Sequence, residues 1–245
     1  FAQLSDDEHR DAIRHYLAFC SYEDHLFGRV LDALVQSGAD DDTVVMYMSD
    51  HGDYACEHGL WCKGLPAFDS AYHIPAIVRP PRGSAAAGRT VEQPVALVDF
   101  APTVLELAGI DRNRPASGRS LMPWLRGETP SDWPEDVFFQ SNGNEVYGIQ
   151  RGVMTPTHRF VFNSFDHDEL YDLTNDPGQM TNLARDPEQA GVIKAMYGKL
   201  WRFMLKHRDT YVNDYIMTAL MDYGPAAFGD DLRSVLDAKD ASDEP

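Results

Sequence analysis

An aspartate and a histidine stand side by side at the end of a short apolar segment, in the sequence Ser49-Asp50-His51-Gly52. The preceding run, residues 43–48, is apolar and rich in β-branched side chains, which is typical of a strand buried on both faces. Ligands in open α/β sheets bind beyond the carboxyl ends of strands, and a glycine lets the chain turn there. A carboxylate and an imidazole make a mixed ligand pair for a divalent cation. The alternative is a turn aspartate beside a surface histidine.

The loop after this dipeptide carries three more groups with chemical potential. Lys63 could contact an anionic substrate, because an ammonium held near a metal stabilises negative charge. His58 and His73 could exchange protons near neutral pH. Each has a plainer interpretation, since a loop lysine is usually solvated and a histidine is as often a hydrogen-bonded structural residue.

The composition limits the classes of protein to which the chain can belong. It has 245 residues, 43% of them hydrophobic, and 39 acidic against 21 basic side chains give a formal net charge of -18. That hydrophobic content is typical of a folded chain rather than a disordered one. No apolar run reaches the ~18 residues of a membrane span. We expect no nucleic-acid partner, because duplex binding needs a basic face.

The three cysteines do not form a recognisable framework. Cys20 falls in a helical pattern, whereas Cys56 and Cys62 lie close together in the loop after residue 49. A bridge between these two is one interpretation, and free thiols are the one we favour. No C-x-x-C spacing is present, which argues against a thiolate zinc site. The sequence does not indicate a cellular compartment.

The first half of the chain has the pattern of an α/β domain. Ser5 and Glu8 form a predicted capping box, and helical spacing of apolar residues continues with one stripe expected to be buried, up to a stop at Gly38. Residues 43–48 and 74–78 are predicted strands, and residues 102–109 a predicted helix. This order favours part of a mostly parallel sheet flanked by helices.

The pattern changes near residue 115, where proline and glycine become frequent. Closely spaced strand signals then predict a small antiparallel sheet with one helix packed on it. The predicted strands cover residues 137–140, 147–153, 158–163 and 169–173, and the helix covers 187–207. We therefore expect an α/β part over residues 1–125, a C-terminal subdomain over 136–208 and an acidic tail over 209–245.

Several ordered motifs resemble the C-terminal half of a sulfatase, a family of the alkaline-phosphatase-like superfamily. The similarity covers about residues 14 to 207, and the motifs lie at matching spacing. They are Ser49-Asp50-His51-Gly52, Glu57-His58-Gly59-Leu60-Trp61, Lys63-Gly64, His73-Ile74-Pro75-Ala76, Asp99-Phe100-Ala101-Pro102-Thr103, and Glu169-Leu170-Tyr171-Asp172-Leu173 with Asp176-Pro177 and Asn182-Leu183.

The resemblance implies a role for each matched residue. Asp50 and His51 match two ligands of the active-site divalent cation, commonly Ca²⁺, with Mg²⁺ or Mn²⁺ as alternatives. Lys63 matches the catalytic lysine that contacts the sulfate and the leaving-group oxygen. His58 and His73 lie in the same loop and are carried over only as substrate contacts. The implied substrate is a sulfate ester.

One departure from the family pattern is large. The family's nucleophile is a formylglycine made from the first residue of C-x-P-x-R or S-x-P-x-R, and neither motif occurs here. The family's N-terminal pair of aspartate ligands is also absent. The resemblance therefore implies a sulfatase whose N-terminal part, a further partner of this chain, supplies the nucleophile. Two alternatives stay open: a phosphonate monoester or phosphodiester hydrolase of the same superfamily, and a non-catalytic fragment or subunit. The oligomeric state is not indicated.

Overall fold

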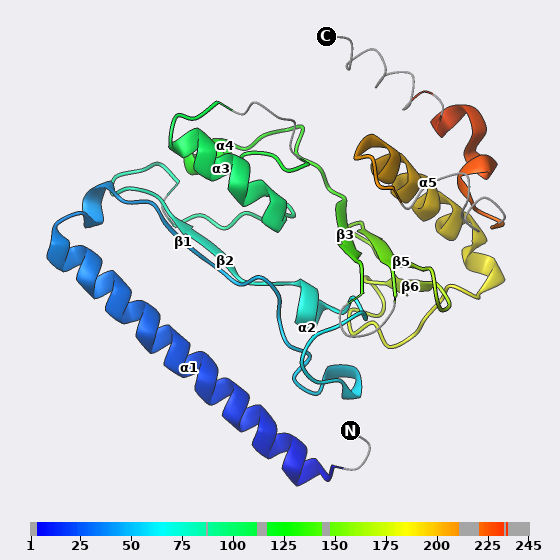
Figure 1. The fold of residues 1–245 in the computed structure, drawn as a ribbon, viewed down its shortest axis with the longest axis horizontal. Helices are drawn as coiled ribbons and strands as arrows, with labels where there is room; N and C mark the ends of the chain where they lie inside the picture. Colours follow the sequence, from blue (N-terminus) through cyan, green and yellow to red (C-terminus); the bar gives the residue numbers. More distant parts are fainter. Residues whose placement is uncertain are drawn as a thin grey trace. The chain divides into compact units, whose positions relative to one another are not determined.

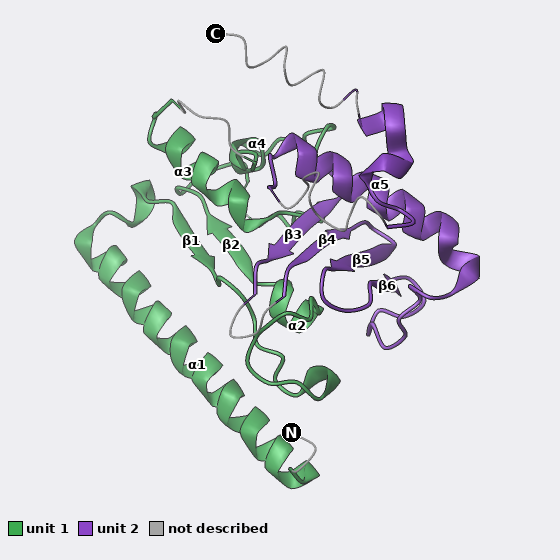
Figure 2. Ribbon diagram, turned by 45° about the vertical axis from the view of Figure 1, so that its right-hand side comes forward, with its two compact units in different colours: residues 1–133 green, residues 134–245 purple. Residues whose placement is uncertain are grey.

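The chain forms two compact units, residues 1–133 and residues 134–245 (Figure 2). The computed structural model describes residues 4–86, 88–111, 117–143, 148–210, 221–232 and 234. Each unit has its own secondary structure and its own buried cluster, so each is described by itself. Most of the acidic tail expected over 209–245 lies outside the described residues.

The first unit begins with one long helix, α1, which spans Asp6–Ser37 (Figure 1). Both predicted ends are confirmed. The Ser5 amide donates to the Glu8 carboxylate at 2.7 Å, and the Glu8 amide donates back to the Ser5 hydroxyl at 3.4 Å. Gly38 ends the helix with a φ of 78°, a left-handed conformation that glycine adopts without strain.

The apolar stripe of α1 is not buried, which corrects the expectation from the sequence. No residue of the helix is buried, and side chains such as Phe19 and Val30 are 69% and 63% exposed. A helix of this length is about 48 Å long, whereas a four-residue strand spans roughly 13 Å. The unit's strands therefore cover only part of it, through contacts such as Phe27 on Tyr47. None of the helices in the described ranges is long and apolar enough to cross a membrane.

Two short strands, β1 (Val45–Met48) and β2 (Ala76–Arg79), follow α1 and the 3₁₀ turn Asp40–Asp42. They pair antiparallel, with Val45 opposite Arg79 and Met48 opposite Ala76. The expected parallel relation is therefore wrong for these two strands. The physical reason is the connection, whose helices Glu57–Gly59 and α2 (Asp69–Tyr72) are too short to form a crossover.

The helices α3 (Phe100–Leu107) and α4 (Met122–Leu125) complete the first unit, after the 3₁₀ turn Leu97–Asp99. They contribute to a small core of Phe100, Leu121, Trp124 and Trp133, against which Met46, Met48 and Val78 of the two strands pack. The buried Thr103 hydroxyl links this core to the chain around it, because it donates to the Asp99 carbonyl and accepts from the Leu121 amide.

The second unit is a four-stranded sheet with one long helix. Strands β3 (Val137–Ser141), β4 (Gln150–Met154), β5 (His158–Asn163) and β6 (Glu169–Asp172) lie in this order, and every neighbouring pair is antiparallel. The predicted antiparallel arrangement is confirmed, although Tyr147 of the expected second strand lies outside the described residues. Helix α5 spans Ala190–Lys206, after a 3₁₀ turn at Pro187–Gln189, and a last short turn covers Pro225–Phe228.

The core of the second unit forms where α5 covers one face of the sheet. Val153, Phe160 and Leu170 are fully buried there. The helix contributes a continuous stripe of buried side chains, made of Ile193, Met196, Tyr197, Leu200, Trp201 and Met204. Each large apolar side chain buried in this way stabilises the fold by about 1.5–3 kcal/mol relative to an exposed one, which explains why this short segment forms a separate unit.

Gly152 in β4 gives a test of this packing. A methyl group at this position would lie 2.0 Å from the ring of Phe139, the residue opposite it on β3. We expect Gly152→Ala to lower the free energy of unfolding by about 1–3 kcal/mol, because the ring must move. The matched control is Gly191→Ala in α5, where a methyl group meets no atom within 4 Å. Chemical denaturation should show a loss for the first variant only, and equal stabilities would contradict the packing described.

Candidate active site

The predicted ligands Asp50 and His51 lie directly after β1, in the loop that leads to α2 (Figure 1). The chain leaves strand geometry at Ser49, whose hydroxyl donates to the His51 carbonyl at 2.6 Å. The His51 amide is 3.0 Å from an oxygen of the Asp50 carboxylate, which accepts from it. These two short-range hydrogen bonds turn the backbone so that both side chains lie on the same side of the strand end.

The imidazole of His51 is held in one orientation by the backbone. Its Nδ1 lies 2.7 Å from the Gly52 carbonyl oxygen, which can only accept a hydrogen bond. Nδ1 therefore carries the proton of the neutral ring, and Nε2 presents its lone pair on the other side. This arrangement is the one that metal-bound histidines commonly have, with one ring nitrogen on a carbonyl and the other on the cation.

Lys63 and Asp50 approach the lone pair of His51 from two directions. The Lys63 Nζ lies 2.7 Å from Nε2, and an oxygen of the Asp50 carboxylate lies 3.6 Å from it. The Asp50 side chain is 83% exposed and that of His51 40% exposed, so the group is open to other molecules. The structure thus brings together the three residues to which the resemblance gives metal-binding and catalytic roles.

The backbone of α2 fixes the position of this loop through a close contact at Gly52. The Gly52 amide donates to the Ala71 carbonyl at 2.8 Å. A methyl group on Gly52 would lie 1.9 Å from the Ser70 carbonyl oxygen, so only glycine fits here. Because the Gly52 carbonyl also holds His51, the contact with α2 determines where the imidazole lies.

The two other predicted histidines are not part of this group. The ring of His58 stacks on Phe68, with centroids 3.6 Å apart, which is a packing contact rather than the hydrogen bond considered from the sequence. His73 follows α2 and is exposed. Across the described residues, neither imidazole hydrogen bonds to Asp50, His51 or Lys63. A substrate role for His58 and His73 stays a prediction.

The residues that hold the loop after β1 in position were not predicted from the sequence. Tyr54 is buried, its hydroxyl donates to the Pro66 carbonyl at 2.6 Å, and its amide donates to Cys62. The Sγ of Cys56 lies 3.2 Å from Nδ1 of His9, at the start of α1. The signal available for Tyr54 was an aromatic residue within a polar, glycine-rich segment. Nothing in the spacing indicates the contact between Cys56 and His9.

The donor set fits part of the shell of a divalent cation. A carboxylate and an imidazole lone pair are both ordinary ligands for such ions. Calcium usually takes about 6–8 oxygen ligands, and the described residues contain no cluster of three or more histidines, cysteines or carboxylates that could hold a metal. Asp50 and His51 therefore fit a cation whose remaining ligands come from elsewhere.

Comparison with known families places this loop in context. The family model for sulfatases matches residues 1–110, and the model for the C-terminal part of N-sulphoglucosamine sulphohydrolase matches residues 56–206. The chain belongs to the sulfatase family. Asp50, His51 and Lys63 all lie within the region matched by the first model.

Individual relatives agree with this family membership. This chain is 32% identical to the uncharacterized sulfatase YidJ of Escherichia coli K12 over 203 residues, which are 80% of this chain and 39% of YidJ. A solved 2-O GAG sulfatase aligns with 86% of this chain at 27% identity and a TM-score of 0.76. The phosphonate monoester hydrolase of Agrobacterium radiobacter aligns with 74% of this chain at 28% identity and a TM-score of 0.69. The alignments with this chain cover 46% and 38% of these two solved chains.

The contact at Gly52 predicts a specific defect. We expect Gly52→Ala to displace the loop from α2, because its methyl group cannot share space with the Ser70 carbonyl. The segment from Asp50 to Lys63 should then become sensitive to limited proteolysis. Gly64→Ala is the control in the same loop, since its nearest neighbour is 3.9 Å away and no strain results. Equal protease resistance of the two variants would contradict the role given to Gly52.

Proposed function

We propose that the complete enzyme is a sulfatase that hydrolyses sulfate esters with the help of a divalent cation. The observation that supports this most is the grouping of three side chains at the end of β1, with the Lys63 ammonium 2.7 Å and the Asp50 carboxylate 3.6 Å from Nε2 of His51. In a member of the sulfatase family, this set offers two metal ligands and one cationic hydrogen-bond donor for an anionic substrate.

Each residue of the group has a task that follows from its chemistry. Asp50 and His51 would hold the cation, which would supply Lewis-acid stabilisation of charge on the sulfate oxygens. Lys63 donates a hydrogen bond to the leaving-group oxygen, where negative charge accumulates as the ester bond breaks. We assign Ca²⁺ to this site, with Mg²⁺ or Mn²⁺ as alternatives, because the family resemblance implies this ion and the Asp50 carboxylate suits a hard cation.

The N-terminal part of the same enzyme is the partner that this account requires. We infer that it supplies the formylglycine nucleophile and the remaining metal ligands. Exposed apolar side chains support this inference, because the N-terminal part would cover them. They lie along α1 and at Ile77 of β2. In the complete enzyme, β1 and β2 would join a larger, mostly parallel sheet of the alkaline-phosphatase-like type. The division into residues 1–125 and 136–208 is part of the same proposal.

A phosphonate monoester or phosphodiester hydrolase is the second candidate. A cation and a lysine around a tetrahedral oxyanion suit phosphonyl transfer as well as sulfuryl transfer. The structural similarity to the hydrolase of Agrobacterium radiobacter favours this candidate specifically. A third interpretation is a non-catalytic fragment or subunit. The grouping of Asp50, His51 and Lys63 argues against it, because it places two residues of metal-ligand type and a cationic donor together.

The experiment compares two esters of one alcohol. The complete enzyme is assayed with 4-nitrophenyl sulfate and 4-nitrophenyl phenylphosphonate, so that the leaving group is the same. The sulfatase proposal expects the higher kcat/KM for the sulfate. A higher value for the phosphonate would support the second candidate, and hydrolysis of neither ester by a protein that carries formylglycine would support the third.

The metal ligands give the next prediction. Asp50→Ala and His51→Ala should each weaken binding of Ca²⁺ or Mn²⁺ by at least about tenfold, because each removes a direct ligand. Isothermal titration calorimetry on the complete enzyme measures this. Asp53→Ala is the control, since that nearby carboxylate accepts from the Ala55 amide and lies outside the group. Unchanged affinity in the Asp50 and His51 variants would remove the metal assignment.

Lys63 gives a prediction about turnover. Lys63→Ala should lower kcat by about 100–1000-fold, which corresponds to ~2.7–4 kcal/mol and to the loss of one oxyanion donor. KM should change less, because charge on the leaving oxygen develops mainly in the transition state. Lys63→Arg should not restore the full rate, since a planar fork replaces a compact ammonium.

A series of leaving groups separates the two roles of Lys63. Esters of acidic phenols need less help at the leaving oxygen, so they should lose less activity in Lys63→Ala than esters of simple alcohols. The control is Lys194→Ala, which removes an exposed lysine of α5. Equal losses for good and poor leaving groups would leave Lys63 with sulfate binding alone.

A further inference from the structure

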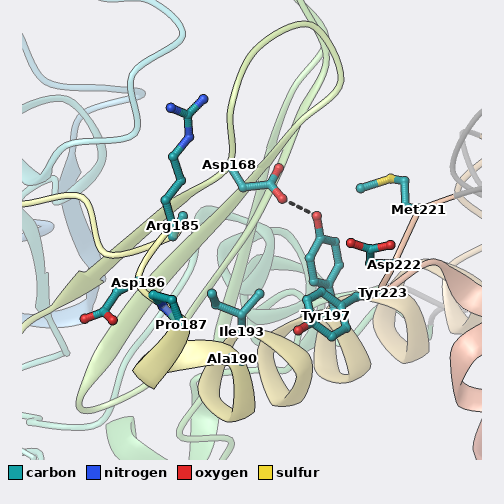
Figure 3. Close-up of a pocket in the computed structure, with 11 residues that line it drawn as sticks. Asp168, Arg185, Asp186, Pro187, Ala190, Ile193, Tyr197, Met221, Asp222 and Tyr223 are labelled. Carbon is teal, nitrogen blue, oxygen red and sulfur yellow. Dashed lines mark hydrogen bonds between the residues drawn. The ribbon is translucent and has the colours of Figure 1, made fainter.

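The second unit contains a cavity that the proposed sulfatase chemistry does not use. It is open to solvent rather than enclosed, and its volume is about 550 Å³. Asp168, the residues just before α5, the first turns of that helix and residues 221–223 line it (Figure 3). All of these residues belong to the second unit.

A half-buried carboxylate without an ionic partner lies at one end of the cavity. Asp168 accepts hydrogen bonds from the Tyr197 hydroxyl and from the Asn163 amide, which are both neutral donors. It forms no ion pair with a lysine or arginine of the described ranges. Burial raises the pKa of Asp168 above its usual range, although both hydrogen bonds and the adjacent His167 oppose this rise. The carboxylate is therefore poorly compensated.

The arginine of the cavity does not compensate this charge. The Arg185 guanidinium donates to Nε2 of His167. Figure 3 shows Arg185 directed away from the hydrogen bond between Asp168 and Tyr197. With Asp168, Asp186 and Asp222 against one guanidinium, the lining carries a net negative charge.

The rest of the lining is apolar and aromatic. Ile193 of α5, with Pro187 and Met221, provides an aliphatic wall. The rings of Tyr197 and Tyr223 lie 5.8 Å apart, and Tyr223 is positioned by the Trp201 indole, which donates to its carbonyl at 2.8 Å. The cavity thus combines a carboxylate end with tyrosine rings and an apolar side.

We propose that this cavity binds an organic ammonium ion, with the cationic group at Asp168 and the apolar body against Ile193. An ammonium would supply the ionic partner that the carboxylate lacks, through a charge-assisted hydrogen bond. An anionic ligand would meet the net negative charge of the lining, and a purely apolar one would leave the carboxylate uncompensated. The proposal is independent of the sulfatase reaction.

The test uses a matched pair of probes on the complete protein. Cyclohexylmethylamine and cyclohexylmethanol have nearly the same shape, and only the amine is charged at neutral pH. We expect the amine to bind with a Kd of about 1 mM, as suits a ligand of this size. The alcohol should bind at least tenfold more weakly. Two-dimensional NMR of amide groups or calorimetry measures both affinities. Absence of amine binding, or equal affinity for the two probes, would overturn the proposal.

Variants locate the binding. Asp168→Asn keeps the size and an accepting oxygen of the side chain, and it should weaken amine binding at least tenfold. Glu188→Gln is the control, because that exposed carboxylate lies in the turn before α5 but does not line the cavity. It should change the affinity less than twofold. Equal losses in both variants would show diffuse attraction to an acidic surface and would overturn the site. Thermal unfolding of Asp168→Asn shows whether this variant is folded. If it is not, Tyr197→Phe replaces it, because that variant retains the carboxylate of Asp168. Tyr197→Phe should still bind the amine and not the alcohol.

Discussion

The close approach of Gly52 to the backbone of Ser70 and Ala71 is the contact on which the candidate active site depends. It leaves no room for a side chain, and it anchors the strand end to α2 by one amide hydrogen bond. The Gly52 carbonyl then holds Nδ1 of His51, which leaves Nε2 directed toward Asp50 and Lys63. The backbone of Gly52 therefore determines the tautomer and direction of the His51 imidazole, in the way that outer hydrogen bonds orient metal ligands generally.

The two units differ in how completely they bury their own apolar surface. The second unit encloses residues such as Phe160, Leu170 and Trp201, which have almost no exposed surface. The first has only a small core around Phe100 and Trp124, while its longest helix buries no residue. The difference agrees with the length of the segment, which spans 39% of YidJ. The proposed N-terminal part would cover the apolar surface that the first unit leaves exposed.

Local signals in the sequence were reliable, whereas relations between distant segments were not. The ends of α1 followed from Ser5, Glu8 and Gly38, because capping depends on a few neighbouring residues. The antiparallel sheet of the second unit followed from strand length and spacing. The pairing of β1 with β2 was predicted wrongly, since an apolar run does not specify the direction of its neighbour. The pairs Cys56 with His9 and Asp168 with Tyr197 join residues far apart in the chain, so no local pattern could indicate them.

The central claim is that Asp50 and Nε2 of His51 bind a divalent cation in the complete enzyme. Crystals of that enzyme grown with Mn²⁺, and measured at the manganese absorption edge, test it most directly. The account predicts an anomalous peak in coordination distance of both the Asp50 carboxylate and Nε2, with Nδ1 of His51 still donating to the Gly52 carbonyl. A manganese ion bound elsewhere, or an imidazole that binds it through Nδ1, would contradict the account.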